Sequence, residues 1–193
     1  MSERFKGGVM VTGSTGFVGG SLAERLYSDG ENVIPVSRSE GEIAGIIGIR
    51  RMDSTNLEEV TRTICKYKPE YIYDFAGWSK PSESKDDPKG AELITVRSLE
   101  NLFIAISKAQ IYDNTYKPKQ IVIATSVAAF GPGRIDQNGR PLSLNENSGW
   151  RPNSEYGMLK ATATDMAIEF GQKYGVNVIA AIQANAGGSS EYF

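Results

Sequence analysis

The chain has 193 residues, 40% of them hydrophobic, which fits one α/β domain with a sizeable core. Its net charge of −2 gives no electrostatic reason to expect nucleic acid or an anionic membrane as a partner. No apolar run approaches the roughly 20 residues that span a bilayer, so we expect no membrane association. The polar segment 1–8 lacks the apolar centre of a signal peptide, and a cytoplasmic location is therefore expected.

Histidine is absent, and Cys65 is the only cysteine. The missing histidine excludes Ser-His-Asp and Cys-His catalysis and histidine-ligated zinc, and we expect no metal site. A single cysteine excludes an intrachain disulfide, and we interpret Cys65 as a packing residue of a helix. An acid–base catalyst in this chain must therefore be Tyr, Lys, Asp, Glu or the lone Cys.

Short apolar runs alternate with longer amphipathic segments along the chain. The predicted strands are residues 9–12, 33–36, a short strand ending near Met52, 71–75, 120–125 and 176–182. The predicted helices are residues 16–28, 56–67, 91–109 and a helix capped by Ser154 that runs to about Tyr174. Segment 43–49 is apolar but rich in glycine and receives no assignment, and segment 131–152 is predicted to be a loop.

This alternation predicts an α/β fold of the Rossmann type, with a doubly wound parallel sheet and helices on both faces, over residues 1–193 as one domain. Ligands of such sheets bind at the carboxyl ends of the strands. Polar or small residues follow the predicted strands at that edge: Gly13, Ser37, Asp53, Gly77 and Ser126.

A glycine-rich loop separates the first predicted strand from the first predicted helix. Its residues are Gly13, Ser14, Thr15, Gly16, Phe17, Val18 and Gly19. In this pattern the first glycine permits a tight turn, the second lets the backbone approach a pyrophosphate, and the third lets the helix lie close to the strand. The helix N-terminus adds N–H groups and a partial positive charge, so the loop predicts a dinucleotide-binding site.

Residues after the next strands refine that prediction. Ser37 and Arg38 stand where many NAD-binding domains place an acid, and an arginine there can pair with a 2′-phosphate, so NADP(H) is favoured over NAD(H). Asp53, followed by Ser54, can accept a hydrogen bond from an adenine amino group, although it can also cap the next helix. The small residues of Phe75-Ala76-Gly77 let the backbone pass close to the cofactor.

Tyr156 and Lys160 lie four residues apart, one above the other on a helix face. A tyrosine has a pKa near about 10, and a nearby ammonium favours its phenolate, so Tyr156 is the predicted acid–base group. Lys160 can also hold the nicotinamide ribose, and Ser126 can donate to the substrate oxygen. The predicted chemistry is hydride transfer between a nicotinamide and a carbinol or carbonyl carbon.

These residues together resemble the extended, nucleotide-sugar epimerase/dehydratase branch of the short-chain dehydrogenase/reductase superfamily. The resemblance rests on residues 12–19, on Asp74-Phe75-Ala76-Gly77 with Asp in place of the usual Asn, on residues 125–131, and on Tyr156-Gly157-Met158-Leu159-Lys160. It implies an NAD(P)-dependent oxidoreductase or epimerase acting on a sugar or nucleotide-sugar. It also implies a homodimer built by two long helices, here 91–109 and 154–174.

The chain departs from this branch in two ways. Sugar-nucleotide dehydratases carry acids where this chain has Val127 and Ala128, so an epimerase or reductase is favoured over a dehydratase. Extended members also continue beyond the position of Phe193 with a small substrate domain, which we expect to be largely missing.

Trp78, Ser79, Ser126 and Asn185 are the candidate substrate contacts. Two alternatives stay open: an NADP-binding module without catalysis, and a dehydrogenase of a small sugar acid or alcohol.

Overall fold

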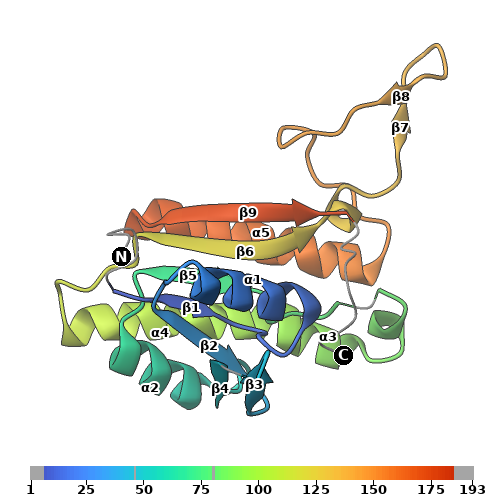
Figure 1. Ribbon diagram of the computed structural model, residues 1–193. Helices are drawn as coiled ribbons and strands as arrows, with labels where there is room; N and C mark the ends of the chain where they lie inside the picture. Colours follow the sequence, from blue (N-terminus) through green and yellow to red (C-terminus); the bar gives the residue numbers. More distant parts are fainter. Residues whose placement is uncertain (1–6, 46, 80, 185–193) are drawn as a thin grey trace.

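The computed structural model describes residues 7–45, 47–79 and 81–184. Within these residues a seven-stranded sheet has the order β3-β4-β2-β1-β5-β6-β9 (Figure 1). Its strands are β1 (Val9–Val11), β2 (Val33–Ser37), β3 (Gly41–Ile43), β4 (Ile47–Arg51), β5 (Tyr71–Asp74), β6 (Gln120–Ser126) and β9 (Asn177–Gln183). The main helices are α1 (Phe17–Ser28), α2 (Leu57–Tyr67), α3 (Pro88–Glu92), α4 (Ser98–Tyr112) and α5 (Glu155–Tyr174).

The predicted Rossmann-type sheet is confirmed, with one difference at its edge. Strands β4, β2, β1, β5, β6 and β9 pair in parallel, whereas β3 pairs antiparallel with β4. The hairpin between β3 and β4 occupies much of the segment that received no assignment. Ala44 and Gly45 both have positive φ there, 51° and 66°, so the backbone reverses direction within the apolar run.

Helices cover the two faces of the sheet unequally. Figure 1 shows α1 in front of the strands and α4 and α5 behind them. Behind the sheet, α2, α4 and α5 bury a core that includes Met10, Ile72 and Ile121, and in front α1 packs on Val9 and Val11. Successive strand residues thus point into different cores, as the two-residue period of a strand requires.

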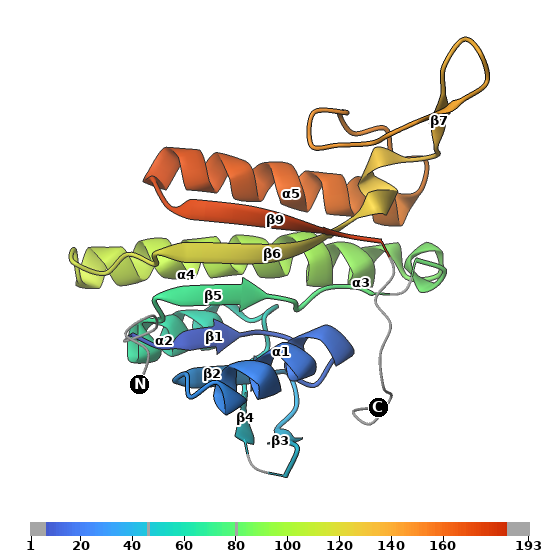
Figure 2. The ribbon, with the colours of Figure 1, turned by 45° about the horizontal axis from the view of Figure 1, so that its top comes forward.

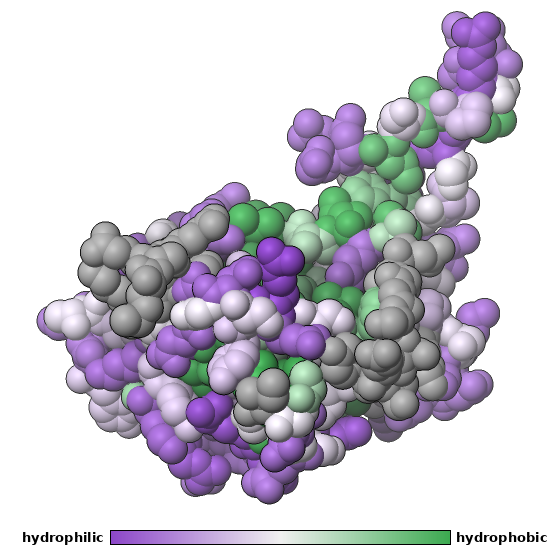
Figure 3. Space-filling model, viewed as in Figure 1, coloured by the Kyte–Doolittle hydropathy of each residue, from purple (hydrophilic) through white to green (hydrophobic). Residues whose placement is uncertain are grey.

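The front of the sheet beyond α1 is less covered. Ile179 of β9 is exposed, and Val122 of β6 is half-buried. Figure 3 shows hydrophobic surface in the region of β6 and β9. No helix among the described residues is long and apolar enough to cross a membrane.

The predicted loop 131–152 forms an arm that projects from the body of the protein (Figure 2). Two short antiparallel strands, β7 (Arg134–Ile135) and β8 (Pro141–Leu142), lie within it. At its base the ring of Trp150 lies 4.8 Å from that of Phe130, and its indole N–H donates to Asp165. The arm is therefore anchored where it leaves and rejoins the body.

Capping residues fix where α2 and α5 begin. Asn56 caps α2 by accepting from the backbone N–H groups of Glu58 and Glu59. Ser154 caps α5 by accepting from the N–H of Gly157 at 3.1 Å, which confirms the predicted cap. The predicted helix 91–109 is longer than expected, because α3 and α4 are joined by a π-helical turn, η3 (Leu93–Arg97).

Candidate functional site

A cavity of about 1130 Å³ opens at the carboxyl ends of the central strands. It lies where ligands of open parallel sheets bind. Nearly all of the predicted site residues line it: Gly13, Thr15, Gly16, Phe17, Val18, Gly19, Arg38, Asp53, Ser54, Phe75, Ala76, Gly77, Trp78, Ser79, Ser126, Tyr156 and Lys160. The structure thus brings together residues from both halves of the chain.

Of the remaining predicted residues, Ser14 does not line the cavity. Ser14 is buried, and its hydroxyl donates to the carbonyl of Val11 at 2.8 Å, so it supports the loop from behind. Asn185 lies outside the described residues.

The glycine loop packs closely against neighbouring backbone, as its glycine pattern predicts. Gly13 has φ +64°, and a Cβ there would lie 2.7 Å from the carbonyl oxygen of Phe75. A Cβ at Gly19 would overlap the carbonyl oxygen of Gly13. The first turn of α1, all of it described, carries no acidic side chain. Bare backbone and the positive end of α1 therefore face the cavity, which suits an anionic ligand.

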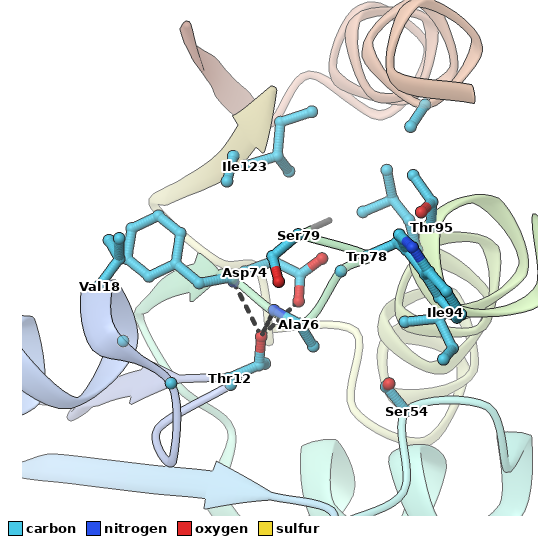
Figure 4. A pocket seen from close by; sticks show the side chains of 18 of the residues that line it. Thr12, Val18, Ser54, Asp74, Ala76, Trp78, Ser79, Ile94, Thr95 and Ile123 are labelled. Atoms are coloured by element: carbon cyan, nitrogen blue, oxygen red, sulfur yellow. Dashed lines mark hydrogen bonds between the residues drawn. The ribbon is translucent and has the colours of Figure 1, made fainter. Parts of the chain in front are cut away.

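Thr12 ties the glycine loop to the end of β5. Its hydroxyl donates to Asp74 Oδ1 at 2.5 Å and accepts from the N–H groups of Phe75 and Ala76 (Figure 4). This arrangement fixes the loop that follows β5 against the floor of the cavity. The role of Thr12 has no local sequence signal, because its hydrogen bond to Asp74 joins residues 62 positions apart.

The side of the cavity at β2 and β4 carries Arg38 and Asp53. Arg38 is exposed, while the neighbouring Ser37 hydroxyl pairs with that of Thr15 at 2.7 Å. Burial opposes the charge of Asp53, but hydrogen bonds from Thr55 and the fields of nearby arginines outweigh it and hold its pKa below the ordinary value. Asp53 is therefore a carboxylate, and Asn56 rather than Asp53 caps the helix.

Ser126, Tyr156 and Lys160 form the opposite wall. Ser126 ends β6, and Tyr156 and Lys160 lie one turn apart on α5, 8% and 6% exposed. The Lys160 ammonium lies 5.7 Å from the centre of the Tyr156 ring and 3.5 Å from the carbonyl oxygen of Ala124. Gly157 allows this arrangement, since a Cβ there would overlap the carbonyl of Ala128 in the 3-10 turn that follows β6.

Burial controls the protonation of this wall. It raises the pKa of the Tyr156 phenol above its ordinary value, and the Ser126 hydroxyl only partly opposes that shift. Burial also lowers the pKa of Lys160, against the attraction of Asp74. The expected net lowering of the phenol pKa by Lys160 is therefore not found, because desolvation of the phenolate is the larger effect in this structure.

Two further threonines were not anticipated. The buried hydroxyl of Thr164 lies 2.7 Å from both Thr125 Oγ1 and the carbonyl oxygen of Lys160, which joins α5 to β6 beside the site. Thr95 lies in the π-helical turn η3 and lines the cavity (Figure 4). Its buried hydroxyl has no hydrogen-bond partner within the described part of the chain. The positions of Thr164 and Thr95 beside the site depend on tertiary packing, which the spacing of residues in the sequence does not reveal.

Known proteins share this architecture. The UDP-glucose 4-epimerase of Brucella ovis, solved with NAD, has a TM-score of 0.80 and 23% identity, covering 95% of this chain and 53% of that one. The Thermus thermophilus UDP-glucose 4-epimerase, also with NAD, has a TM-score of 0.74 and 22% identity, covering 90% and 53%. These likenesses show the fold, and the chain spans about half the length of both proteins.

Sequence comparisons point the same way. A UDP-glucose 4-epimerase of Mycolicibacterium smegmatis is 29% identical over 87 residues, which are 41% of this chain and 28% of that protein. The sequence model of the NAD dependent epimerase/dehydratase family matches residues 9–192, nearly the whole chain. The chain therefore belongs to the NAD-dependent epimerase/dehydratase family.

Proposed function

We propose that the chain binds a nicotinamide dinucleotide and is a nucleotide-sugar epimerase-type oxidoreductase. One observation carries the proposal: the glycine loop and the Ser126, Tyr156 and Lys160 wall line the same cavity. Proteins of similar fold are described as UDP-glucose 4-epimerases in complex with NAD or, from Thermotoga maritima, with UDP-glucose. A pyrophosphate-linked sugar is the substrate class that this similarity favours.

The residues present fit a dinucleotide. Gly13 and Gly19 let the loop pack directly against neighbouring backbone, where a Cβ would clash, and the N-terminus of α1 opens onto the cavity beside this loop. Asp53 remains ionised at the far end and can accept from an adenine amino group. When bound, the cofactor's chemistry is to accept and return a hydride.

The chain's own groups would handle the proton and the orientation of the substrate. The phenol of Tyr156 exchanges a proton with the substrate oxygen, and burial, which raises the pKa of the phenol, favours its protonated form. The Ser126 hydroxyl donates to the same oxygen, and Lys160 holds the ribose. Val127 and Ala128 form a turn beside them without a carboxylate, which favours epimerisation or reduction over dehydration.

Arg38 supports a preference for NADP(H) over NAD(H). It is exposed at the end of β2 and lines the cavity, and Ser37 beside it already pairs with Thr15. A guanidinium there can bind a 2′-phosphate in a bidentate way. The nearby carboxylate of Asp53 lies two residues after the end of β4 and accepts hydrogen bonds from Thr55.

A homodimer remains part of the proposal. Helices α4 and α5 pack together and carry exposed large apolar side chains, among them Ile104, Ile111, Met158 and Ile168. A second copy would cover apolar surface that these helices expose. Sedimentation analysis tests this point, with a mass of twice 21.0 kDa expected.

The test of the proposed function is hydride transfer. The protein is mixed with NADP⁺ or NAD⁺ and a panel of nucleotide-sugars. The absorbance of the reduced nicotinamide reports net oxidation, and chromatography of the sugars reports epimerisation, in which the hydride is returned and no reduced nicotinamide accumulates. Reduction or epimerisation that depends on Tyr156 supports the proposal. Cofactor binding without any transfer contradicts it and favours a binding module, while transfer only with small sugar acids or alcohols favours the smaller-substrate dehydrogenase.

A further inference from the structure

Asp74 is a half-buried acid at the centre of the site whose charge has no role in the function proposed so far. It ends β5, and it points to the same side of the strand as Ile72, which packs in the core beneath α4 and α5. Lys160 approaches this place from α5. Its ammonium lies 3.2 Å from where a Cβ of Gly77 would be, three residues after Asp74.

The register of the sheet brings the two side chains together. Asp74 pairs with Ile123 of β6, and the next residue of β6, Ala124, has its carbonyl oxygen 3.5 Å from Lys160 Nζ. Figure 4 shows Asp74 at the cavity wall, bonded to Thr12. The carboxylate ends β5 and the ammonium lies beside the end of β6, and the two groups, both in the described part of the chain, attract each other electrostatically without a direct ion-pair contact.

We propose that Asp74 is a positioning residue, whose carboxylate attracts the Lys160 ammonium and directs it at the cavity wall. The inference rests on the proposed function, since it is there that Lys160 holds the cofactor beside Tyr156. Burial lowers the pKa of Lys160, because an ammonium loses its hydration in the pocket, and the attraction of Asp74 opposes that shift. A negative charge in the same pocket therefore favours the charged form.

The hydrogen bonds of Asp74 do not explain why this position carries an acid and not a neutral side chain. An asparagine could accept the same bond from Thr12 and would avoid the cost of burying a charge. Burial raises the pKa of Asp74 to about 6, so the charged form costs stability at neutral pH. What a carboxylate adds at this position is its negative charge, and Lys160 is the described cation that this charge acts on.

Within residues 7–45, 47–79 and 81–184, the other groups that contact Asp74 or Lys160 are uncharged. From β1, Thr12 offers a hydroxyl, and the segment after β5 offers the N–H of Ala76. From β6 comes the carbonyl of Ala124, and from α5 the neutral phenol of Tyr156. Above pH about 6 Asp74 is therefore a carboxylate that attracts Lys160, and below that pH the lysine loses this negative partner.

The titration of Lys160 tests the inference without any substrate. The protein is prepared with isotope-labelled lysine, and the signal of Lys160 is assigned by its loss in Lys160→Met. In the wild-type NMR titration we expect an inflection near pH 6 from Asp74, followed by the lysine's own titration at higher pH. In Asp74→Asn we expect the first inflection to vanish and the second to move to lower pH.

Asp29→Asn is the matched control, because it removes one exposed carboxylate at the end of α1 and should leave the Lys160 curve unchanged. Asp74→Glu, which restores the charge, should recover a low-pH inflection. A wild-type curve without that inflection, or a folded Asp74→Asn with an unchanged curve, would overturn the inference.

Hydride transfer, measured on the same wild-type sample, separates the two proposals. No transfer with the coupled titration present contradicts the proposed function and leaves the Asp74–Lys160 pair supported. Transfer without the coupled titration contradicts the role of Asp74 alone.

Discussion

The two walls of the cavity differ in what builds them. The glycine-loop wall is mostly backbone, held by close approaches such as that of Gly13 to Phe75. The wall of Ser126, Tyr156 and Lys160 consists of side chains whose protonation depends on burial and neighbours. The backbone packing of the first wall can be predicted from residue types alone. The protonation of the side chains in the second wall depends on the whole tertiary environment.

The largest expected effect concerns the side-chain wall. Tyr156→Phe removes the proposed proton-transferring group and should lower kcat by about 10²–10⁴-fold. Cofactor affinity should change little, because the glycine loop is untouched. Stopped-flow absorbance of the reduced nicotinamide measures the rate, and fluorescence titration measures the affinity. Unchanged turnover would remove Tyr156 from the mechanism.

A single added methyl group at Gly13 should disrupt the glycine-loop wall. Gly13→Ala places a Cβ 2.7 Å from the Phe75 carbonyl oxygen at φ +64°, so cofactor binding should be lost. Gly30→Ala is the matched control, since Gly30 has φ +82° but open space around it. Both variants carry the strain of a positive φ, about 1–2 kcal/mol, and only Gly13→Ala carries the clash. Equal binding by the two variants would contradict the cradle.

Asp74 links the two walls, and its titration predicts a pH-dependent stability. Because burial raises its pKa from 3.8 to about 6, the folded state keeps a proton that the unfolded state has released between these pH values. The stability contribution is therefore full below pH about 4 and is lost as pH rises through about 6, a change of about 3 kcal/mol.

Asp74→Asn should remove this loss. Urea unfolding should show the variant more stable than wild type above pH about 6, by up to about 3 kcal/mol, and equally stable at low pH. A variant less stable at every pH would show that the carboxylate is needed for the fold itself.

The smallest expected effect is at the rim of the backbone wall. Arg38→Ala should weaken NADPH binding by about tenfold and leave NADH binding unchanged, since only NADPH offers a 2′-phosphate to the guanidinium. Titration calorimetry with both cofactors measures the difference. An equal loss for both would assign Arg38 to the pyrophosphate or to the fold rather than to the choice of cofactor.

Sequence periodicity predicted most of the central sheet and the cap of α5 at Ser154, because buried strands and capping residues leave local signals. It missed the β3–β4 hairpin, whose turn at Ala44 and Gly45 lies inside an apolar run, and the π-helical turn within the helix that ends at Tyr112. Neither feature has a local pattern strong enough to outweigh its surroundings.

In the candidate site, too, features with a local sequence pattern were predicted and features that depend on tertiary packing were not. Motifs located the residues that line the cavity, but they did not reveal that burial raises the pKa of Tyr156, and they gave no function to the charge of Asp74. Desolvation depends on atoms from α5, β5 and β6 together, and no short segment encodes it. The individual residue roles, the dimer and the cytoplasmic location remain predictions.

Fluorescence titration of the protein with NADPH and NADH, beside Gly13→Ala, tests the central claim most directly. The account predicts that the wild type binds a nicotinamide dinucleotide, NADPH more tightly than NADH, and that Gly13→Ala binds neither. Binding of neither cofactor by the folded wild type, or undiminished binding by Gly13→Ala, would contradict it.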